Sequence, residues 1–288
     1  MSSVAKRTTR GALGQRRQVW QTVVLYVLLV LAVVVIIFPI YYALAISLMA
    51  PSEASLYPPH FVPHQFTWQN YEAVLRRLPI PRYLLNSLIV SVVVVIGQLI
   101  TASLAAYAFA MREFKGRTVL FVLFLSTLMI PFEVTIIPNF QTIQRFGWID
   151  NYLGLFGPYL ATAFGTFLLR QFFLTIPKEL HDAAEIDGCS SLRFLVQIVV
   201  PLARPALGTV GVYGFLQTWN QYLWPLLVTN QPQMRTMQIG LRFLNNEEAT
   251  SPTLIMTGVV LAVVPTIVLL FLGQRQLIRG LTAGAVKG

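Results

Sequence analysis

The chain has 288 residues, of which 56% are hydrophobic and 11% are charged, and its mean hydropathy is +0.66. Soluble domains carry about 25% charged residues, so this composition excludes an ordinary soluble protein and predicts a polytopic membrane protein. The net charge of +10 fits basic loops at a membrane surface and requires no nucleic-acid partner.

Six apolar stretches are long enough to cross a hydrocarbon core of about 30 Å, which takes about 20 residues. Four of them, within 17–53, 82–112, 204–235 and 248–275, hold no internal Asp, Glu, Lys or Arg. The other two are 119–138, which holds Glu133, and 152–176, which holds Arg170. The predicted fold class is therefore an all-α polytopic membrane protein with six transmembrane helices.

A basic tail, 1–18, precedes a long apolar run that starts at Trp20. A secretory signal has an apolar core of only about 7 to 15 residues, so this run is predicted to stay as the first transmembrane helix, 19–48, although Ala-Leu-Ala at 43–45 resembles a cleavage site. With the N-terminus inside, 15 of the 21 lysines and arginines lie on the cytoplasmic side. This count agrees with the positive-inside rule and predicts that the tail 275–288 is also cytoplasmic.

The first outer loop, 49–82, is rich in proline, histidine and aromatic residues, a composition that disfavours long regular structure. His60 and His64 are four residues apart, as two metal ligands on one helix would be. Pro59 and Pro63 break the helix that would align them, so a loop without a metal is favoured.

Small residues fill the inner half of the second span, where they allow close helix packing. They are Gly97, Ala102, Ser103, Ala105 and Ala106. In the third span, Pro131 predicts a kink. Glu133 lies near the outer end of that span, and both pathway lining and a position in a wet outer cavity fit it. Arg170 lies near the inner surface, and a structural, snorkelling side chain is favoured there.

The longest polar interruption on the inner side, 176–205, predicts a helix, a sharp turn and a second helix. Pro177 fits a first helical turn, and acidic residues follow it at the positive end of the helix dipole. Gly188 suits the left-handed conformation that closes a helix, and Ser190 or Ser191 suits the cap of the next one. Two alanines leave the middle of the first helix thin, so another protein's backbone can approach it.

This segment resembles the cytoplasmic coupling signature of ABC importer permease subunits, in which Glu-Ala-Ala precedes a glycine and a distal Leu-Pro. The matching residues are Ala183, Ala184, Gly188, Pro201 and Leu202. Asp182 stands where the family usually has Glu, and Val200 where it usually has Leu before the proline. The resemblance implies that an ATPase subunit docks on Asp182, Ala183, Ala184, Asp187, Gly188 and Pro201.

The fifth span holds a dense polar and aromatic cluster, 217–225. An aromatic belt at the membrane interface explains its tryptophans. It does not explain Asn220 and Gln221, which together with Trp219 and Glu133 are candidates for the substrate pathway.

The tail QRQLIRGLTAGAVKG is similar to the C-terminus of maltose-type carbohydrate permeases, and the region around Trp219 is similar to the glycerol-3-phosphate branch of that family. The resemblance, which covers nearly everything from residue 20 on, implies a type I ABC importer permease with a core at 83–274 and a coupling segment at 177–200. It implies a multi-pass protein of a bacterial or archaeal plasma membrane that pairs with a second permease, two ATP-binding subunits and an extracytoplasmic solute-binding protein.

The chain has no GxxxxGK[ST] phosphate loop, so ATP hydrolysis is expected in a separate subunit. No catalytic residue, metal site or cofactor is expected. The sequence favours a neutral sugar as solute, because a phosphate ester such as sn-glycerol 3-phosphate or a glycerophosphodiester would need a cation along its path. An intramembrane enzyme and a secondary transporter are the other classes weighed. The sequence lacks the catalytic constellation of the first and the paired broken helices of the second.

Overall fold

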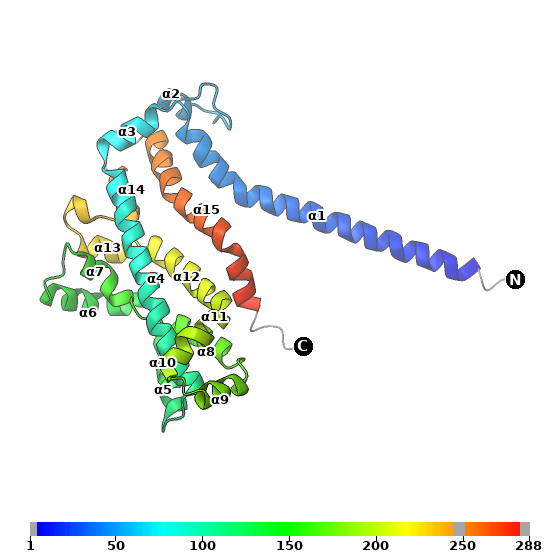
Figure 1. Ribbon diagram of the computed structural model, residues 1–288. Coiled ribbons are helices and arrows are strands. Elements are labelled where there is room, and N and C mark those ends of the chain that lie inside the picture. The colour runs from blue at the N-terminus through cyan, green and yellow to red at the C-terminus, as the bar shows by residue number, and fades with distance from the viewer. Residues whose placement is uncertain (1–4, 245–250, 283–288) are drawn as a thin grey trace. The chain divides into compact units, whose positions relative to one another are not determined.

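The structure is a computed structural model that describes residues 5–244 and 251–282, and within these ranges it is helical with no strand (Figure 1). The chain forms two compact units. The first comprises Met1–Glu72 and Ser251–Val260, and the second comprises Ala73–Thr250 and Leu261–Gly288. The all-α class predicted from the composition is confirmed.

Three helices each hold a stretch long and apolar enough to cross a membrane. They are α1 (Ala5–Ser47), α4 (Ile80–Met111) and α15 (Pro252–Thr282). Three further candidates are pairs of helices separated by a short, sharply bent break. The described chain therefore has up to six spans if each bent pair crosses the membrane once, in agreement with the predicted number.

The first bent pair joins α5 (Arg117–Ser126), extended by a short 3₁₀ turn at Thr127–Met129, to α6 (Phe132–Arg145). Pro131 lies at the break, where its backbone is extended, and the two helices differ in direction by 97°. The predicted kink is confirmed, but it is nearly a right angle. A proline in extended conformation cannot continue the preceding helix, so α6 begins anew after it.

The other two bends are smaller. Helix α7 (Tyr152–Phe156), extended by Gly157–Tyr159, meets α8 (Ala163–Phe173) at 45°. The segment Ser191–Leu202 meets α12 (Arg204–Trp219) at 82°. Short helices complete the second unit. They are α9 (Lys178–Ile186), α10 (Ser191–Phe194), α11 (Val200–Leu202), α13 (Leu223–Val228) and α14 (Met237–Leu244).

Helix α4 is the central packing element of the second unit and contributes to two cores. Towards its C-terminal end it packs with α8, α9, α10 and α12 around a cluster that includes Ala106, Phe173 and Val210. Nearer its N-terminus, Val90 and Val94 pack with residues of α6, α7 and α13, among them Trp224. The indole Nε1–H of Trp224 donates to the Gly154 carbonyl oxygen at 3.0 Å, so this large side chain is buried without an orphaned donor.

Small residues allow these close approaches, as the sequence predicts. Ala102 and Ala106 of α4 are fully buried. Gly165 of α8 faces Ala102 and Val210 so closely that an added Cβ would lie 3.1 Å from a Val210 methyl group. Gly97 faces Leu160, where an added Cβ would lie 2.6 Å from a side-chain carbon. In a membrane, where the hydrophobic effect does not drive helices together, such contacts supply much of the packing energy.

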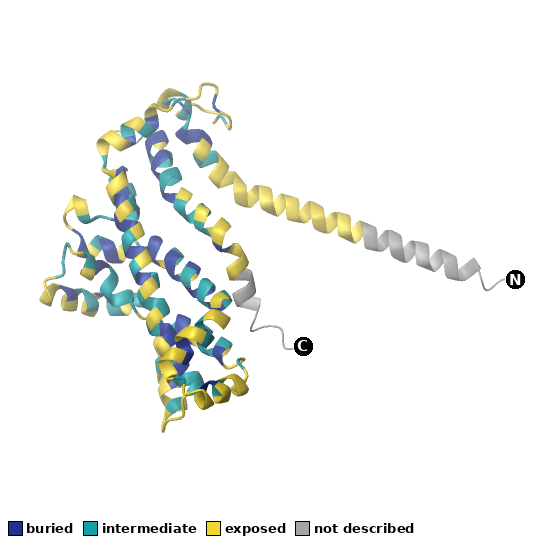
Figure 2. Ribbon diagram, in the orientation of Figure 1, coloured by how far each residue is buried: buried dark blue, intermediate teal, exposed yellow. Residues whose placement is uncertain are grey.

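In the first unit, the side chains of α1 from residue 20 to residue 41 are all exposed, as the yellow stretch in Figure 2 shows. This apolar surface suits lipid or another transmembrane helix. The end of α1 is anchored by Asn70 of α3 (Gln69–Arg77), whose amide donates to the carbonyl oxygens of Ser47 and Met49 at 2.9 and 2.7 Å. The predicted tail 1–18 has no described side chains, and residues 1–4 lie outside the described chain altogether.

Candidate functional site

The predicted helix, turn and helix over 176–205 are present. Pro177 precedes α9 in an extended conformation, one residue earlier than the first-turn position predicted from the sequence. Gly188 has φ +72°, which confirms the left-handed closing residue. The Cys189 N–H donates to the Ala184 carbonyl at 2.8 Å and the Gly188 N–H donates to Glu185 at 3.0 Å, so the turn satisfies the last carbonyls of α9.

The second helix begins after Ser190, whose backbone carbonyl accepts from the Phe194 N–H at 2.8 Å. Neither serine caps through its side chain. The Ser191 hydroxyl instead accepts from the Arg112 guanidinium at 3.1 Å, which ties this helix to the end of α4. The next turn, Leu195–Val199, is a π-helix that leads into the turn containing Pro201.

The adjacent alanines of α9 have different surroundings. Ala184 is buried in the core cluster that also holds Phe173 of α8 and Phe194 of α10, whereas Ala183 is exposed. A small residue is therefore required at Ala184 by the protein's own packing. Of the two alanines, only Ala183 lies on the exposed side of α9, where a small side chain lets another protein's backbone approach.

The exposed side of α9 carries two large apolar side chains. Ile186 is 86% exposed and Leu180 is 42% exposed, and Ala183 lies between them at helical spacing. Asp182 and Asp187 are exposed as well. An apolar stripe with an acidic margin on a short exposed helix is typical of a surface that another protein covers. We call Leu180, Ala183 and Ile186 the α9 stripe.

A cleft of about 510 Å³ borders α9 on the side of α4 and α5. Its lining combines apolar side chains, such as Met111 and Phe173, with charged ones, among them Glu113, Arg117, Lys178, Asp182 and Glu185. His181 also lines it, with its ring edge-to-face against Phe194 at 5.1 Å between centroids. The cleft gives a partner a concave surface beside the α9 stripe.

The fifth-span cluster is divided in the same way. Trp219 is 2% exposed, its Nε1–H donates to the Ala262 carbonyl at 3.2 Å, and its ring stacks on Phe215 at 5.5 Å. Asn220 is exposed at the end of α12, while Gln221 is half-buried with its Oε1 enclosed and unpaired among the described residues. Trp219 therefore attaches α12 to α15, and only Asn220 of these three residues is freely accessible.

Two accessible polar residues that sequence reasoning did not select lie on the same face as Asn220. Tyr213 and Gln217 are exposed, and the Gln217 amide donates to the Tyr213 hydroxyl at 2.7 Å. Positions 213, 217 and 220 follow the spacing of one helical face. That spacing is the signal that could have identified them. We call these three residues the α12 polar face.

Comparison with known proteins identifies the family. Residues 98–282 match the model of the binding-protein-dependent transport system inner membrane component. The chain is 38% identical over 268 residues to the sn-glycerol-3-phosphate transport system permease protein UgpE of Agrobacterium fabrum, covering 90% of this chain and 95% of the relative. The corresponding protein of Rhizobium meliloti is 36% identical over 265 residues, or 89% and 94% of the two chains.

The chain belongs to this family of transport permeases. Its fold is also that of a solved bacterial ABC transporter involved in the import of the acidic polysaccharide alginate, with a TM-score of 0.81, 23% identity, and 90% of this chain and 97% of that chain covered. The permease is thus a multi-pass inner-membrane protein of an ABC importer.

The two charges that the permease carries within predicted spans have different environments. Arg170 donates through Nε to the Phe109 carbonyl at 3.1 Å, and its guanidinium lies over the Phe121 ring at 4.1 Å. This agrees with the structural role expected for it. Glu133 is exposed in the first turn of α6, next to the break at Pro131, and no hydrogen bond or ion pair between described residues joins it to α12.

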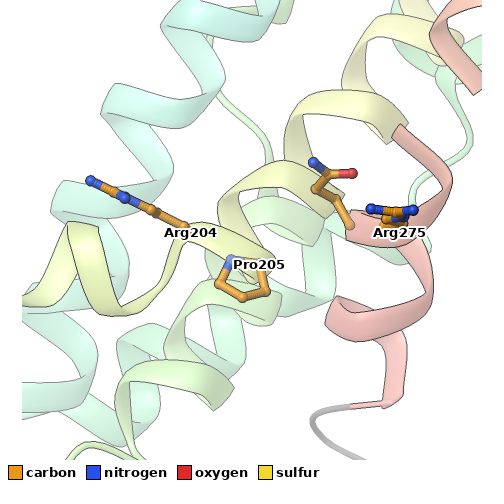
Figure 3. Close-up of a pocket in the computed structure, with 4 residues that line it drawn as sticks. Arg204, Pro205 and Arg275 are labelled. Carbon is orange, nitrogen blue, oxygen red and sulfur yellow. The ribbon is translucent and has the colours of Figure 1, made fainter. Parts of the chain in front are cut away.

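A further cleft, of about 340 Å³, lies where α12 begins and α15 nears its end. Arg204, Pro205, Arg275 and Gln276 line it. Figure 3 shows that the side chains of Arg204 and Arg275 point in different directions. The two guanidinium groups therefore do not converge on one anion.

Proposed function

We propose that the permease imports sn-glycerol 3-phosphate or a related glycerophosphodiester, as one of two permease subunits that enclose the translocation pathway. The observation that carries this substrate is the identity of 36–38%, over about nine tenths of the chain, to permeases named for sn-glycerol-3-phosphate transport. The neutral sugar favoured by composition becomes the second candidate.

The α12 polar face supports a hydroxylated solute of either kind. The Asn220 and Gln217 amides and the Tyr213 hydroxyl offer hydrogen-bond donors and acceptors to glycerol or sugar hydroxyls. They offer no positive charge, and Arg170 is engaged with Phe109 and Phe121. For a phosphate ester, this permease binds the glycerol part, and the partner permease supplies the cation that the phosphate requires.

ATP hydrolysis resides in two separate ATPase subunits, one of which docks on the α9 stripe. Docking covers the exposed Ile186 and Leu180, while Ala183 lets the partner's backbone approach. Ala184 packs with Phe173 and Phe194, so a displacement of α9 moves α8 and α10 with it. Through the 82° bend before α12, the movement of α10 reaches the α12 polar face.

The substrate is tested in the complete complex, reconstituted with its ATPase subunits and its binding protein. Stimulation of ATP hydrolysis by sn-glycerol 3-phosphate, with none by maltose or other neutral sugars, is the expected result. Stimulation by a neutral sugar alone would overturn the substrate and favour the second candidate. No stimulation by any tested solute, in a complex that hydrolyses ATP, would contradict both candidate substrates.

The orientation is tested by accessibility, with both termini and α9 expected in the cytoplasm. In a Cys189→Ser background, single cysteines near Ala12 and after Gly280 are expected to be protected from an impermeant thiol reagent in intact cells. A cysteine near Asn245, which lies outside the described residues, is expected to react. Labelling of either terminus from outside would reverse the topology and remove α9 from the ATPase subunits.

A further inference from the structure

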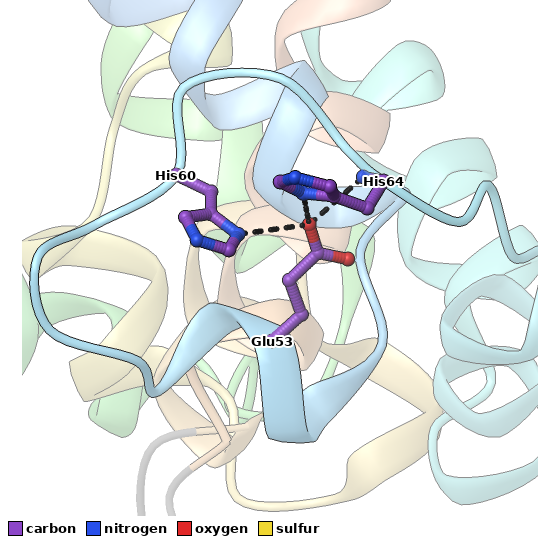
Figure 4. Close-up of side chains that lie close together, drawn as sticks. All are labelled: Glu53, His60 and His64. Carbon is purple, nitrogen blue, oxygen red and sulfur yellow. Dashed lines mark hydrogen bonds and ion pairs between the residues drawn. The ribbon is translucent and has the colours of Figure 1, made fainter.

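Three potential metal ligands of the first unit converge in the loop that follows α1. Glu53 lies on α2 (Pro51–Ala54), and its Oε1 is 2.9 Å from His64 Nδ1 and 3.3 Å from His60 Nδ1. Figure 4 shows both imidazole rings directed at the same carboxylate oxygen. One ligand atom from each of the three residues lies within 4.8 Å of the other two.

We propose that Glu53, His60 and His64 form a binding site for a divalent transition-metal ion of the zinc type. Zinc takes imidazole nitrogen and carboxylate oxygen at about 2.0–2.1 Å, so two ligand atoms of a tetrahedral site are about 3.3 Å apart. The distances of 2.9 and 3.3 Å are close to this spacing, and small side-chain rotations complete it. Two histidines, one carboxylate and a water are a tetrahedral ligand set that zinc uses.

The loop does not need a helix to align the histidines, which was the reason the sequence argued against a metal. Its backbone is anchored between the two histidines, at Phe61, and beyond them, at Thr67. The Phe61 ring packs against Phe38 and Tyr42 of α1 at 6.0 and 5.7 Å, and its carbonyl accepts from the Tyr41 hydroxyl at 3.0 Å. Further along, the Thr67 N–H donates to Leu48 at 2.9 Å. The two rings are therefore held near Glu53 before an ion arrives.

Hydrogen bonds hold the ligand atoms of the free site close together. The His64 backbone N–H donates to Glu53 Oε1 at 2.8 Å, and both imidazole rings contact the same oxygen through Nδ1. A histidine binds a metal ion through Nδ1 only when that nitrogen carries no proton. A proton that Nδ1 shares with Glu53 Oε1 in the free site therefore moves to Nε2 of the same ring, or to water, when the ion binds.

The exposure of the three ligands shows how an ion reaches the site. The His64 side chain is 71% exposed and that of His60 is 33% exposed, whereas that of Glu53 is 10% exposed, so an ion enters from solvent. Once bound, the ion links α2 to the loop that packs on the end of α1. We expect it to act as a structural clip at that end of the first transmembrane helix. The site does not depend on which solute the permease carries.

The test uses the complete importer purified in detergent through a histidine-free tag and stripped with EDTA. Co²⁺ serves as the visible probe, and Zn²⁺ as its competitor. We expect one Co²⁺ per permease with the absorption of a tetrahedral site, displaced by Zn²⁺. Glu53→Gln, His60→Gln and His64→Gln should each weaken Co²⁺ binding by more than about tenfold. Loss of a residue that only orients a metal ligand already costs about 10- to 100-fold in affinity, and loss of a ligand itself should cost at least as much.

The matched control is His181→Gln, because His181 is the third and last histidine of the chain and lies on α9. It should leave metal binding by the permease unchanged. A measurement on the wild-type importer avoids any folding defect of the variants. Zn²⁺ should protect His60 and His64, but not His181, from diethylpyrocarbonate. Equal protection of all three histidines, no stoichiometric Co²⁺ binding, or binding unaffected by the three ligand variants would overturn the site.

Discussion

Helix α9 and the end of α12 each carry a pair of adjacent residues that the structure divides between interior and surface. In α9, Ala184 is buried and Ala183 is exposed, and in α12, Trp219 is buried and Asn220 is exposed. The exposed sides differ in chemistry. Around Ala183 they are apolar in a segment outside the spans, and around Asn220 they are polar within a span.

Each exposed surface therefore mismatches its surroundings. The apolar α9 stripe would face water, and the α12 polar face would face lipid. Removing the Ile186 side chain from water would be energetically favourable, so the α9 stripe indicates a surface that a protein partner covers. Gln217 in lipid would lack hydrogen-bond partners beyond Tyr213, so the α12 polar face indicates a wet cavity or a polar partner. The comparison separates docking from translocation, and the variants below test it in order of decreasing effect.

The largest effect is expected at Trp219. Trp219→Ala removes a buried ring that stacks on Phe215 and donates a hydrogen bond to the Ala262 carbonyl. Large-to-small changes of this kind lower the free energy of unfolding by about 3–5 kcal/mol. Asn220→Ala, the adjacent control, should change stability by less than about 0.5 kcal/mol and weaken solute stimulation. Thermal unfolding of the detergent-solubilised protein measures the stability of both variants, and the ATPase assay of the reconstituted complex measures the stimulation by solute. Equal losses of stability would show that Asn220 belongs to the packing and not to a pathway.

A smaller loss of stability is expected from Ala184→Leu. The added atoms have to enter the cluster with Phe173 and Phe194, and overpacking costs about 1–3 kcal/mol. Ala183→Leu adds the same atoms to the surface, so its unfolding temperature should not change although the ATPase subunits dissociate. The two variants are compared by thermal unfolding and by copurification of ATPase. The reverse pattern would contradict the assignment of the two alanines.

The sequence predicted α9 better than it predicted α12, for physical reasons. The position of Gly188 follows from the backbone conformation that ends a helix, which is a local property. Which alanine faces the core depends on how α8 and α10 pack against α9, and the helix's own sequence does not specify that packing. Likewise the aromatic cluster could be found from composition, but the hydrogen bond from Trp219 to Ala262 requires the tertiary placement of α15. The convergence of His60, His64 and Glu53 was missed because a proline-rich loop has no simple periodicity.

Gly188 gives the smallest and most local effect on stability. A non-glycine residue at φ +72° costs about 1–2 kcal/mol, and no atom lies within 4 Å of the Cβ that would be added, so the cost is backbone strain alone. Gly188→Val should leave membrane insertion intact and abolish uptake, because a strained turn would tilt α9 away from the orientation in which we propose that it docks on the ATPase subunit. Gly188→Asn should retain uptake, since asparagine tolerates this conformation. Normal uptake by the valine variant would contradict a role of the turn in coupling.

The central claim is that α9 docks through the side that carries Ala183, and cross-linking in the assembled importer tests it most directly. In a Cys189→Ser background, single cysteines at 183, 184 and 186 are treated with a short thiol-to-amine cross-linker. We expect products with the ATPase subunit from 183 and 186 and none from 184, which is buried in the permease's own core. Cross-linking from 184, or none from 183 and 186 in a complex that still hydrolyses ATP, would contradict the account.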